Sequence, residues 1–300
     1  MNFLRNYMTD SDLMISFPHE SLCDRAVPIL SESLFMSLFH LLLVAIIQGI
    51  TEFLPVSSSG HLILLPNLTG LADQGQVIDV AVHVGTLFAV ILYFWSDVRL
   101  ALLGIPKMLV GKLDDPGAKL AFLLVLATIP VILFGLALKL TGLDDAMRGI
   151  TVIGWTMLIF GLVLYWADQK GATEKVASDW SMKDAVTMGV WQAVALIPGT
   201  SRSGITITAA RFLGYTREDG AKIAMLMSIP TIIASAALLS LDVIGTPDVM
   251  GDIAIVAAMS CIAALAALFL MMKLLQSVSY TPYVIYRIIL GLILLAIAYT

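Results

Sequence analysis

The chain has 300 residues, of which 59% are hydrophobic and only 13% are charged. Soluble domains are about half apolar and about a quarter charged, so this composition excludes a soluble globular protein and indicates an integral membrane protein. The net charge of −5 comes with no basic stripe that would indicate a nucleic-acid partner. Cys23 and Cys261 are too few and too far apart for a disulfide framework.

Residues 1–35 differ from the rest of the chain. They are polar, mixed in charge, and lack the apolar run of a signal peptide. We predict a poorly ordered extension, or an upstream start codon assigned in error before Met36; a soluble regulatory cap is the alternative. Residues 36–300 form the membrane domain.

Six apolar runs in that domain are long enough to span a bilayer, because a transmembrane helix needs about 20 apolar residues. They are residues 78–96, 118–140, 148–167, 220–241, 252–274 and 282–299. Lysine and arginine gather in the intervening loops 97–119 and 168–183, which we therefore expect on the cytoplasmic side. Loop 242–252 is acidic and is expected outside.

Two other apolar regions, 36–70 and 184–214, are interrupted by FLPVSSSGH (53–61) and IPGTSRSG (197–204). Irregular backbone at membrane depth is tolerated only where it lines a cavity or is packed in protein. We therefore predict two re-entrant broken helices that meet at a site near the midplane. Placing Gln48 on Gln192 also superimposes three further pairs and indicates an internal repeat, either parallel or inverted. The pairs are Ser57 with Ser201, Ser59 with Ser203, and Gly60 with Gly204.

The first break carries a carboxylate in an otherwise uncharged region. A charged side chain at the centre of a membrane helix costs about 2.5–3.5 kcal/mol on insertion scales, so Glu52 is a candidate functional residue. Gln48 lies one helical turn earlier on the same face. Ser57, Ser58, Ser59 and His61 follow. The structural alternative is a Glu52 that only hydrogen-bonds a neighbouring helix.

The second break carries a lone cation, Arg202. Ser201 and Ser203 flank it, and Gly204 and Thr206 open the next half-helix. A helix N-terminus favours an anion, and a guanidinium suits phosphate geometry. The alternative is that Arg202 only neutralises Glu52.

Together the two breaks offer the groups that phosphoryl transfer requires, since there the protein mainly positions groups and stabilises oxygen charge. His61 is a candidate proton shuttle. A serine is a candidate nucleophile if His61 or Glu52 takes its proton; otherwise Glu52 activates water or holds a divalent cation. Asp79 and His83, one turn apart, either support the site or cap a helix.

The stretches QGITEFLPVSSSGHLIL (48–64) and PGTSRSGITIT (198–208) resemble the two signature regions of the undecaprenyl-diphosphate phosphatase family, also called the bacitracin-resistance protein family. The resemblance covers residues 36–300. It implies an all-helical polytopic membrane fold with inverted repeats and re-entrant helix pairs. It also implies a multi-pass phosphatase of the bacterial inner membrane, with its site open to the periplasm. Such an enzyme hydrolyses undecaprenyl diphosphate to the monophosphate and inorganic phosphate, recycles the peptidoglycan lipid carrier and confers bacitracin resistance.

The resemblance also implies site residues and a divalent cofactor, Mg²⁺ or Ca²⁺. The expected catalytic residues are Glu52, Ser58, His61 and Arg202. Substrate-binding residues are expected at Gln48, Ser57, Ser59, Ser201, Ser203, Gly204 and Thr206. Glu52, with Gln48, is the expected metal ligand, although Gln48 stands where many members have Glu and leaves a two-carboxylate site in doubt unless Asp79 substitutes. The expected partners are the lipid substrate, membrane lipid and, as an open expectation, a second copy of the chain.

Two other classes remain open at this stage. Broken helices and a midplane anion site would also suit a secondary transporter or flippase of an anionic lipid. The phosphatidic-acid phosphatase superfamily also uses Ser-Arg elements, but it should have a catalytic His where this chain has Thr208. That difference argues against the second class.

Overall fold

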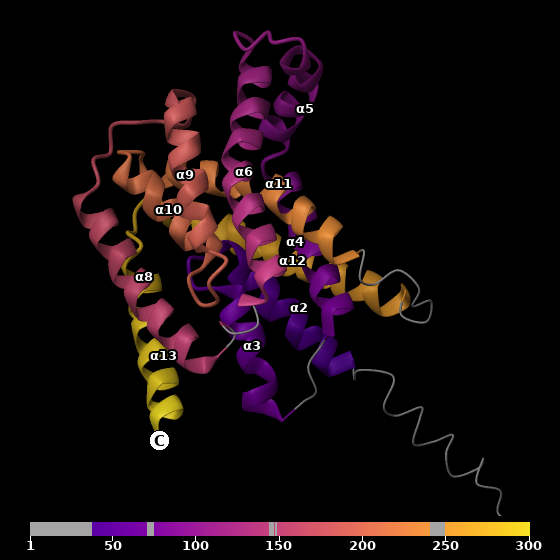
Figure 1. The fold of residues 1–300 in the computed structure, drawn as a ribbon, viewed down its shortest axis with the longest axis vertical. Coiled ribbons are helices and arrows are strands. Elements are labelled where there is room, and N and C mark those ends of the chain that lie inside the picture. The colour runs from indigo at the N-terminus through magenta and orange to yellow at the C-terminus, as the bar shows by residue number, and fades with distance from the viewer. Residues whose placement is uncertain (1–37, 71–74, 144–146, 148, 241–249) are drawn as a thin grey trace, which may run out of the picture. The chain divides into compact units, whose positions relative to one another are not determined.

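The computed structural model describes residues 38–70, 75–143, 147, 149–240 and 250–300, which belong to one compact unit, Leu38–Thr300. The predictions for residues 1–35 and for most of loop 242–252 lie outside the described residues. Apart from one isolated bridge between Lys175 and Tyr215, the regular elements described are all helical. The predicted all-helical class is confirmed (Figure 1).

The helices follow one another along the chain with short connections. They are α2 (Leu38–Phe53), α3 (Ser58–Thr69), α4 (Gly75–Tyr93), α5 (Trp95–Leu109), α6 (Pro116–Thr141), α8 (Ile150–Lys170), the 3-10 turn η1 (Ala177–Asp179), α9 (Met182–Val194), α10 (Arg202–Phe212), α11 (Arg217–Ser240), α12 (Met250–Leu274) and α13 (Thr281–Tyr299).

Five helices are long and apolar enough to cross a membrane, and a bent pair adds up to one more. The five correspond to α6, α8, α11, α12 and α13, so five of the six predicted spans are confirmed and the chain is a multi-pass membrane protein. The sixth, 78–96, is different: α4 ends at Tyr93, and the chain turns by 92° into α5.

The predicted loop 97–119 is therefore wrong over most of its length, because α5 continues to Leu109 and α6 begins at Pro116. Between the basic residues that suggested a loop, small and apolar residues recur every three positions, as on one face of a helix. These residues, Val98, Ala101 and Gly104, are buried, and α5 packs on α6. Gly104 allows the two backbones to touch, since a Cβ there would lie 2.1 Å from the carbonyl carbon of Gly117. Close backbone packing of this kind stabilises α5 where its charge pattern alone would not.

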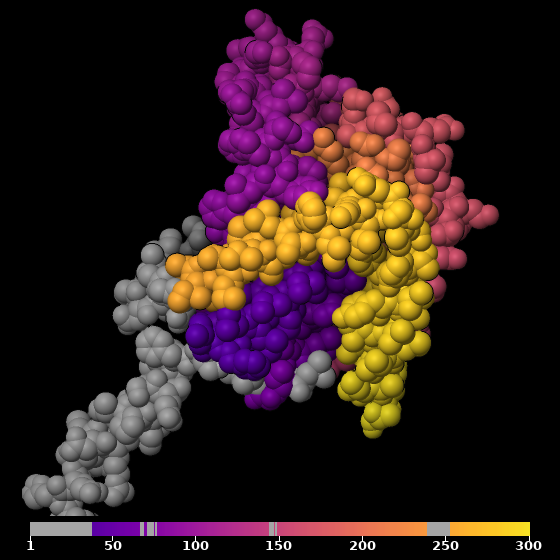
Figure 2. All heavy atoms as spheres, turned by 180° about the vertical axis from the view of Figure 1, so that it is seen from behind, coloured from indigo at the N-terminus to yellow at the C-terminus, as the bar shows by residue number. Residues whose placement is uncertain are grey.

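Glycines also bring α12 against the first half of the chain. Figure 2 shows α12, in orange, lying across α2, in indigo. A Cβ on Gly49 of α2 would lie 2.7 Å from the carbonyl oxygen of Ser260. A Cβ on Gly85 of α4 would lie 2.2 Å from the carbonyl oxygen of Ala257. In the second half α6 packs on α9 through Gly189, where a Cβ would lie 2.4 Å from the Ala127 oxygen.

Both predicted breaks are present, between α2 and α3 and between α9 and α10. The four helices that flank them have 16, 12, 13 and 11 residues. At about 1.5 Å per residue none of them spans a hydrocarbon core of about 30 Å. Short helices of this kind can enter and leave from one side, which agrees with the predicted re-entrant pairs. The internal repeat stays a prediction.

Candidate active site

The two breaks have the same local backbone. Ser57 (φ 74°) and Ser201 (φ 72°) are the non-glycine residues with positive φ among those described. Each serine is the N-cap of the helix that follows, with its Oγ accepting from the amide of Gly60 or Gly204. A non-glycine residue in this region costs of the order of 1–3 kcal/mol, and such strain concentrates at functional sites.

Glu52, at the end of α2, is the centre of the site. Arg202 Nη2 donates to its Oε1 at 2.5 Å, although 150 residues separate the two. The Ser58 hydroxyl donates to Oε2 at 2.6 Å, and the Gln48 amide donates to the same oxygen at 2.9 Å. Glu52 is only 7% exposed, so the ion pair to Arg202 is what keeps this carboxylate charged inside the protein.

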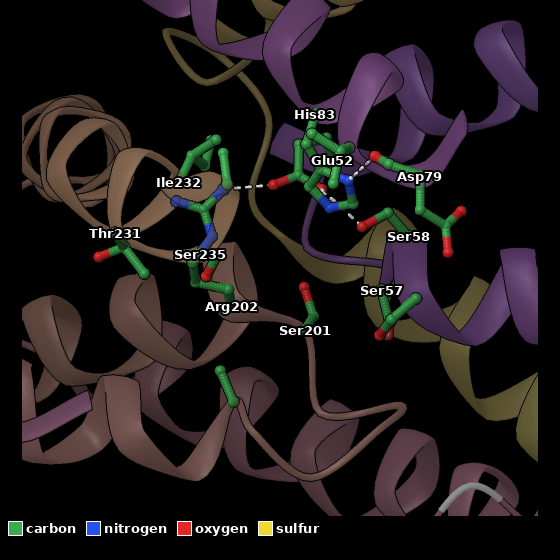
Figure 3. A pocket seen from close by; sticks show the side chains of 14 residues that line it. Glu52, Ser57, Ser58, Asp79, His83, Ser201, Arg202, Thr231, Ile232 and Ser235 are labelled. Carbon is green, nitrogen blue, oxygen red and sulfur yellow. Dashed lines mark hydrogen bonds and ion pairs between the residues drawn. The ribbon is translucent and has the colours of Figure 1, made fainter. Parts of the chain in front are cut away.

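The ion pair lies beside a cavity of about 300 Å³ that both breaks line together with α4 and α11 (Figure 3). Its lining divides into polar and apolar side chains, several of which are neighbours on α4 and α11. The polar lining is Glu52, Ser57, Ser58, Ser59, Asp79, His83, Ser201, Arg202, Thr231 and Ser235, and the apolar lining is Val80, Ala195, Ile232 and Ala236. A cavity with this division suits a molecule with an anionic head and an apolar tail.

His83 and Asp79 of α4 are at the cavity, as one of the two sequence interpretations expected. The Asp79 carbonyl lies 2.6 Å from His83 Nδ1, and His83 Nε2 lies 3.9 Å from Glu52 Oε2. Thr231 and Ser235 of α11 were not singled out in the sequence, where hydroxyls in an apolar span give no clear signal.

His61 is the expected catalytic residue that the structure does not bring to the cavity. Its Nδ1 lies 2.7 Å from the Ser57 carbonyl oxygen, and its Nε2 lies 2.5 Å from the hydroxyl of Tyr286 on α13. The two rings stack with 5.7 Å between centroids. In this position the imidazole supports the strained serine, and an indirect role through Ser57 is the one that this geometry favours.

The remaining expected residues are near the cavity but make mostly internal bonds. Ser203 donates to the Leu54 carbonyl at 2.9 Å and thereby joins the second break to the first. Thr206 donates back to the Arg202 carbonyl at 2.8 Å, within α10. Gly204 presents its amide to Ser201, and Gln48 is buried behind Glu52.

The sequence interpretation did not single out Arg287, which is fully buried on α13. Its guanidinium reaches the carbonyl oxygen of Pro55 at 3.3 Å and that of Gly199 at 3.1 Å. The signal was present, because Arg287 is the charged residue within an otherwise uncharged apolar helix, Thr281–Tyr299. A lone arginine in such a helix is expected to face the protein interior.

The fit of a divalent cation depends on Glu52 and Gln48. The described residues contain no group of three or more His, Cys, Asp and Glu side chains placed to hold a metal. Gln48 Oε1 is buried and has no hydrogen-bond partner in the described part of the chain. Glu52 and the unpartnered oxygen of Gln48 are the groups that would hold a divalent cation, since hard cations such as Mg²⁺ take oxygen ligands.

The sequence matches known proteins over most of its length. Residues 41–293 match the family model described as "Bacitracin resistance protein BacA". This chain belongs to the BacA family. A relative from Jannaschia sp. (strain CCS1), named undecaprenyl-diphosphatase, is 71% identical over 266 residues, covering 88% of this chain and all of the relative.

More distant BacA-family proteins carry the same name. A relative from Ruegeria pomeroyi is 70% identical over 267 residues, covering 88% of this chain and 100% of its own. One from Teredinibacter turnerae is 43% identical over 261 residues, covering 86% and 98%. Both are named undecaprenyl-diphosphatase, so the family resemblance predicted from the two breaks is confirmed.

Proposed function

We propose that this chain hydrolyses undecaprenyl diphosphate to undecaprenyl phosphate and inorganic phosphate, a hydrolysis of a phosphoanhydride. The observation that carries the proposal is the Glu52–Arg202 pair, with Ser58 on the second carboxylate oxygen, at the wall of a cavity lined by both polar and apolar side chains. The names of the BacA-family relatives support the same reaction.

The hydrogen bonds support a role for each group. The incoming diphosphate competes with Glu52 for Arg202, because a guanidinium binds phosphate oxygens as well as it binds a carboxylate. When Arg202 moves to the substrate, Glu52 Oε1 loses its ion-pair partner. Glu52 Oε2 still accepts the hydrogen bond from the Ser58 hydroxyl. Ser58 Oγ, 2.6 Å from that oxygen, is then placed as in other activated nucleophiles.

In the step that we propose, Ser58 Oγ bonds to the terminal phosphorus and its proton passes to Glu52. The bond from that phosphorus to the bridging oxygen breaks, and the lipid monophosphate leaves. Water then hydrolyses the phosphoserine and releases inorganic phosphate. Direct attack by water, with Glu52 as its proton acceptor, needs the same residues and leaves no phosphoserine, so trapping of a phosphorylated Ser58 distinguishes the two.

A divalent cation, Mg²⁺ or Ca²⁺, is part of the proposal as a cofactor. Glu52 and the free amide oxygen of Gln48 are the residues that would hold it. Its contribution, once bound with the diphosphate, would be to neutralise charge on the phosphate oxygens.

The membrane location follows from the same proposal. We place the chain in the bacterial inner membrane, where the basic residues Lys112, Lys170 and Lys175 favour the cytoplasmic side. A site open to the periplasm is what the family resemblance implies. Carrier recycling for peptidoglycan synthesis and bacitracin resistance would follow. The homodimer stays a prediction that light scattering of the detergent-solubilised protein would check.

The deciding experiment is phosphate release by the purified chain in detergent with C55 diphosphate and Mg²⁺. We expect one inorganic phosphate per lipid monophosphate formed. Transport of an intact lipid diphosphate by reconstituted vesicles without phosphate release would instead select the flippase or transporter and reject the phosphatase.

A further inference from the structure

Arg287 connects the two breaks at equivalent positions. In the alignment that places Ser57 on Ser201, Pro55 falls on Gly199. The guanidinium donates to both of these carbonyls, through Nη1 at 3.3 Å and Nη2 at 3.1 Å. Each carbonyl lies two residues before a strained serine. A single side chain therefore fixes the same point of both breaks.

The remaining donors of Arg287 hold the pair of breaks against α8. Nε donates to the Met157 carbonyl at 3.3 Å and Nη2 to that of Thr156 at 3.4 Å. Arg287 is 0% exposed. Its donors are thus distributed over three segments that are far apart in the sequence, which gives the guanidinium a defined position in all three.

The charge of Arg287 has no ion-pair partner in the part of the chain that the structure describes. Among the described residues, no carboxylate forms an ion pair with it, whereas Arg202 is paired with Glu52. An arginine remains protonated in proteins, and a buried charge without a counter-ion is costly. Glu52 is already paired with Arg202, so Arg287 places a positive charge behind the two breaks without an ion-pair partner among the described residues.

Arg211 is the comparison that the chain itself provides. It is 1% exposed, and it also donates to several backbone carbonyls, among them those of Ala172 at 3.1 Å and Gly171 at 3.1 Å. It differs in being ion-paired, with Asp168 Oδ1 at 3.3 Å, and in donating to carbonyls that lie outside the two breaks. Burial and hydrogen bonds to backbone carbonyls are therefore also found in a structural arginine, and they do not by themselves distinguish Arg287.

We propose that Arg287 is a positioning residue of the diphosphate site, which holds the two breaks at a fixed separation and supplies the positive charge that a diphosphate anion neutralises on binding. The inference rests on the proposed phosphatase function. Holding the breaks together places Glu52 and Ser58 relative to Arg202, and a misplacement of about 1 Å in such a constellation can cost about 10²-fold in rate.

The test compares Arg287→Lys and Arg287→Gln with Arg211→Lys in the full chain. Lysine keeps the charge and cannot reach both breaks at once; glutamine loses both properties. Folding is followed by size-exclusion chromatography and the thermal unfolding midpoint. Function is followed by kcat and KM for C55 diphosphate, and by the inhibition constant of inorganic pyrophosphate.

We expect Arg287→Lys to lower kcat about 30-fold or more while the pyrophosphate inhibition constant stays within about threefold. Arg287→Gln should in addition raise that constant about tenfold. Arg211→Lys should lower the unfolding midpoint and leave kcat and the inhibition constant within about twofold. An Arg287→Lys enzyme with the kcat of Arg211→Lys would overturn the positioning role, and an unchanged inhibition constant in Arg287→Gln would overturn the charge.

A milder pair of variants tests the same contact if the arginine variants do not fold. A Cβ on Gly204 would lie 3.0 Å from Arg287 Nη1 and 3.1 Å from Ser201 Oγ, whereas one on the equivalent Gly60 would lie 3.3 Å from Ser57 Oγ and 3.4 Å from Ile153 Cγ2, so that only the first meets Arg287. We expect Gly204→Ala to lose about tenfold in kcat and Gly60→Ala to lose less. Equal losses would contradict the proposal.

A failure of the proposed phosphatase function can be distinguished from a failure of the role proposed for Arg287. If the wild-type chain released no phosphate, the phosphatase would be rejected, and stabilisation by pyrophosphate in thermal unfolding would still compare the anion affinity of wild type and Arg287→Gln. Equal stabilisation of the two would overturn the charge role without reference to turnover.

Discussion

The two breaks have the same backbone and opposite chemistry. Each has a serine N-cap with positive φ, and each is followed by a residue that donates to Glu52: Ser58 in the first break and Arg202 in the second. The difference lies in the preceding helices. Glu52 ends the first of them, and the position that aligns with it in the second is Leu196.

The breaks also differ in how their strained serines are supported. In the second, the amide of Ile205 donates to the Ser201 carbonyl at 2.9 Å, as in a regular first turn. In the first, the equivalent amide of His61 is 3.4 Å from the Ser57 carbonyl, and the His61 ring is 2.7 Å from the same oxygen. The comparison teaches that the same backbone conformation presents a carboxylate on one side and a guanidinium on the other, while side chains packed behind it adjust each half.

The largest expected effect on kcat comes from removing the carboxylate charge of Glu52, which the second break does not have. Glu52→Gln keeps the shape of the side chain and should lower kcat about 10³-fold, because neither Arg202 nor Ser58 then has a charged acceptor. The measurement is phosphate release per folded protein. Leu196→Ala, at the equivalent position of the second break, is the control and should retain kcat within about threefold. An active Glu52→Gln enzyme would falsify the proposed site.

The support of Ser57 by His61 gives the next largest effect. An asparagine at position 61 can still donate to the Ser57 carbonyl, whereas a glutamine places its amide further away. If His61 acts through Ser57, His61→Gln should lose about 10²-fold in kcat and His61→Asn about tenfold or less. Equal losses in both variants would instead indicate that the imidazole itself carries a proton.

The substitution Gln48→Glu adds a second carboxylate to the first break. A second carboxylate beside Glu52 should bind a divalent cation more tightly, and the half-maximal Mg²⁺ concentration should fall about tenfold, which corresponds to about 1.4 kcal/mol. Gln192→Glu, at the equivalent position of the other break, should leave it unchanged. A titration of activity against Mg²⁺ after removal of metal by a chelator measures both. A Gln48→Glu enzyme with the wild-type Mg²⁺ dependence would argue against cation binding at Glu52.

The smallest effects are expected at the two caps. Ser57→Ala and Ser201→Ala each remove an N-cap and should destabilise the protein by about 1 kcal/mol. Ser57→Gly and Ser201→Gly should cost less, because glycine tolerates positive φ. Unfolding midpoints in one detergent give the order of the four variants. A glycine variant less stable than its alanine counterpart would show that the positive φ is not the source of the strain.

The sequence predicted those features that depend on local composition. Apolar runs of about 20 residues have one stable solution in a bilayer, so five of six spans were placed correctly. The breaks were found because serine, glycine and proline interrupt such runs, and Glu52 and Arg202 because a charge in lipid is conspicuous. The α5 helix was missed because Arg99 and Lys107 resemble the basic residues of a loop, and because its packing on α6 depends on a contact at Gly117.

The tertiary structure decided which of these residues face one another. Glu52 and Arg202 are 150 residues apart, and neither composition nor spacing fixes a contact at that separation. The same holds for His61, whose ring position depends on Tyr286, and for Arg287, whose partners belong to three distant segments. The sequence alone determined that this chain is a membrane protein with two broken helices and a few buried charges. Only packing determined their pairing, because the direction of a side chain in a helix bundle depends on which neighbour covers it.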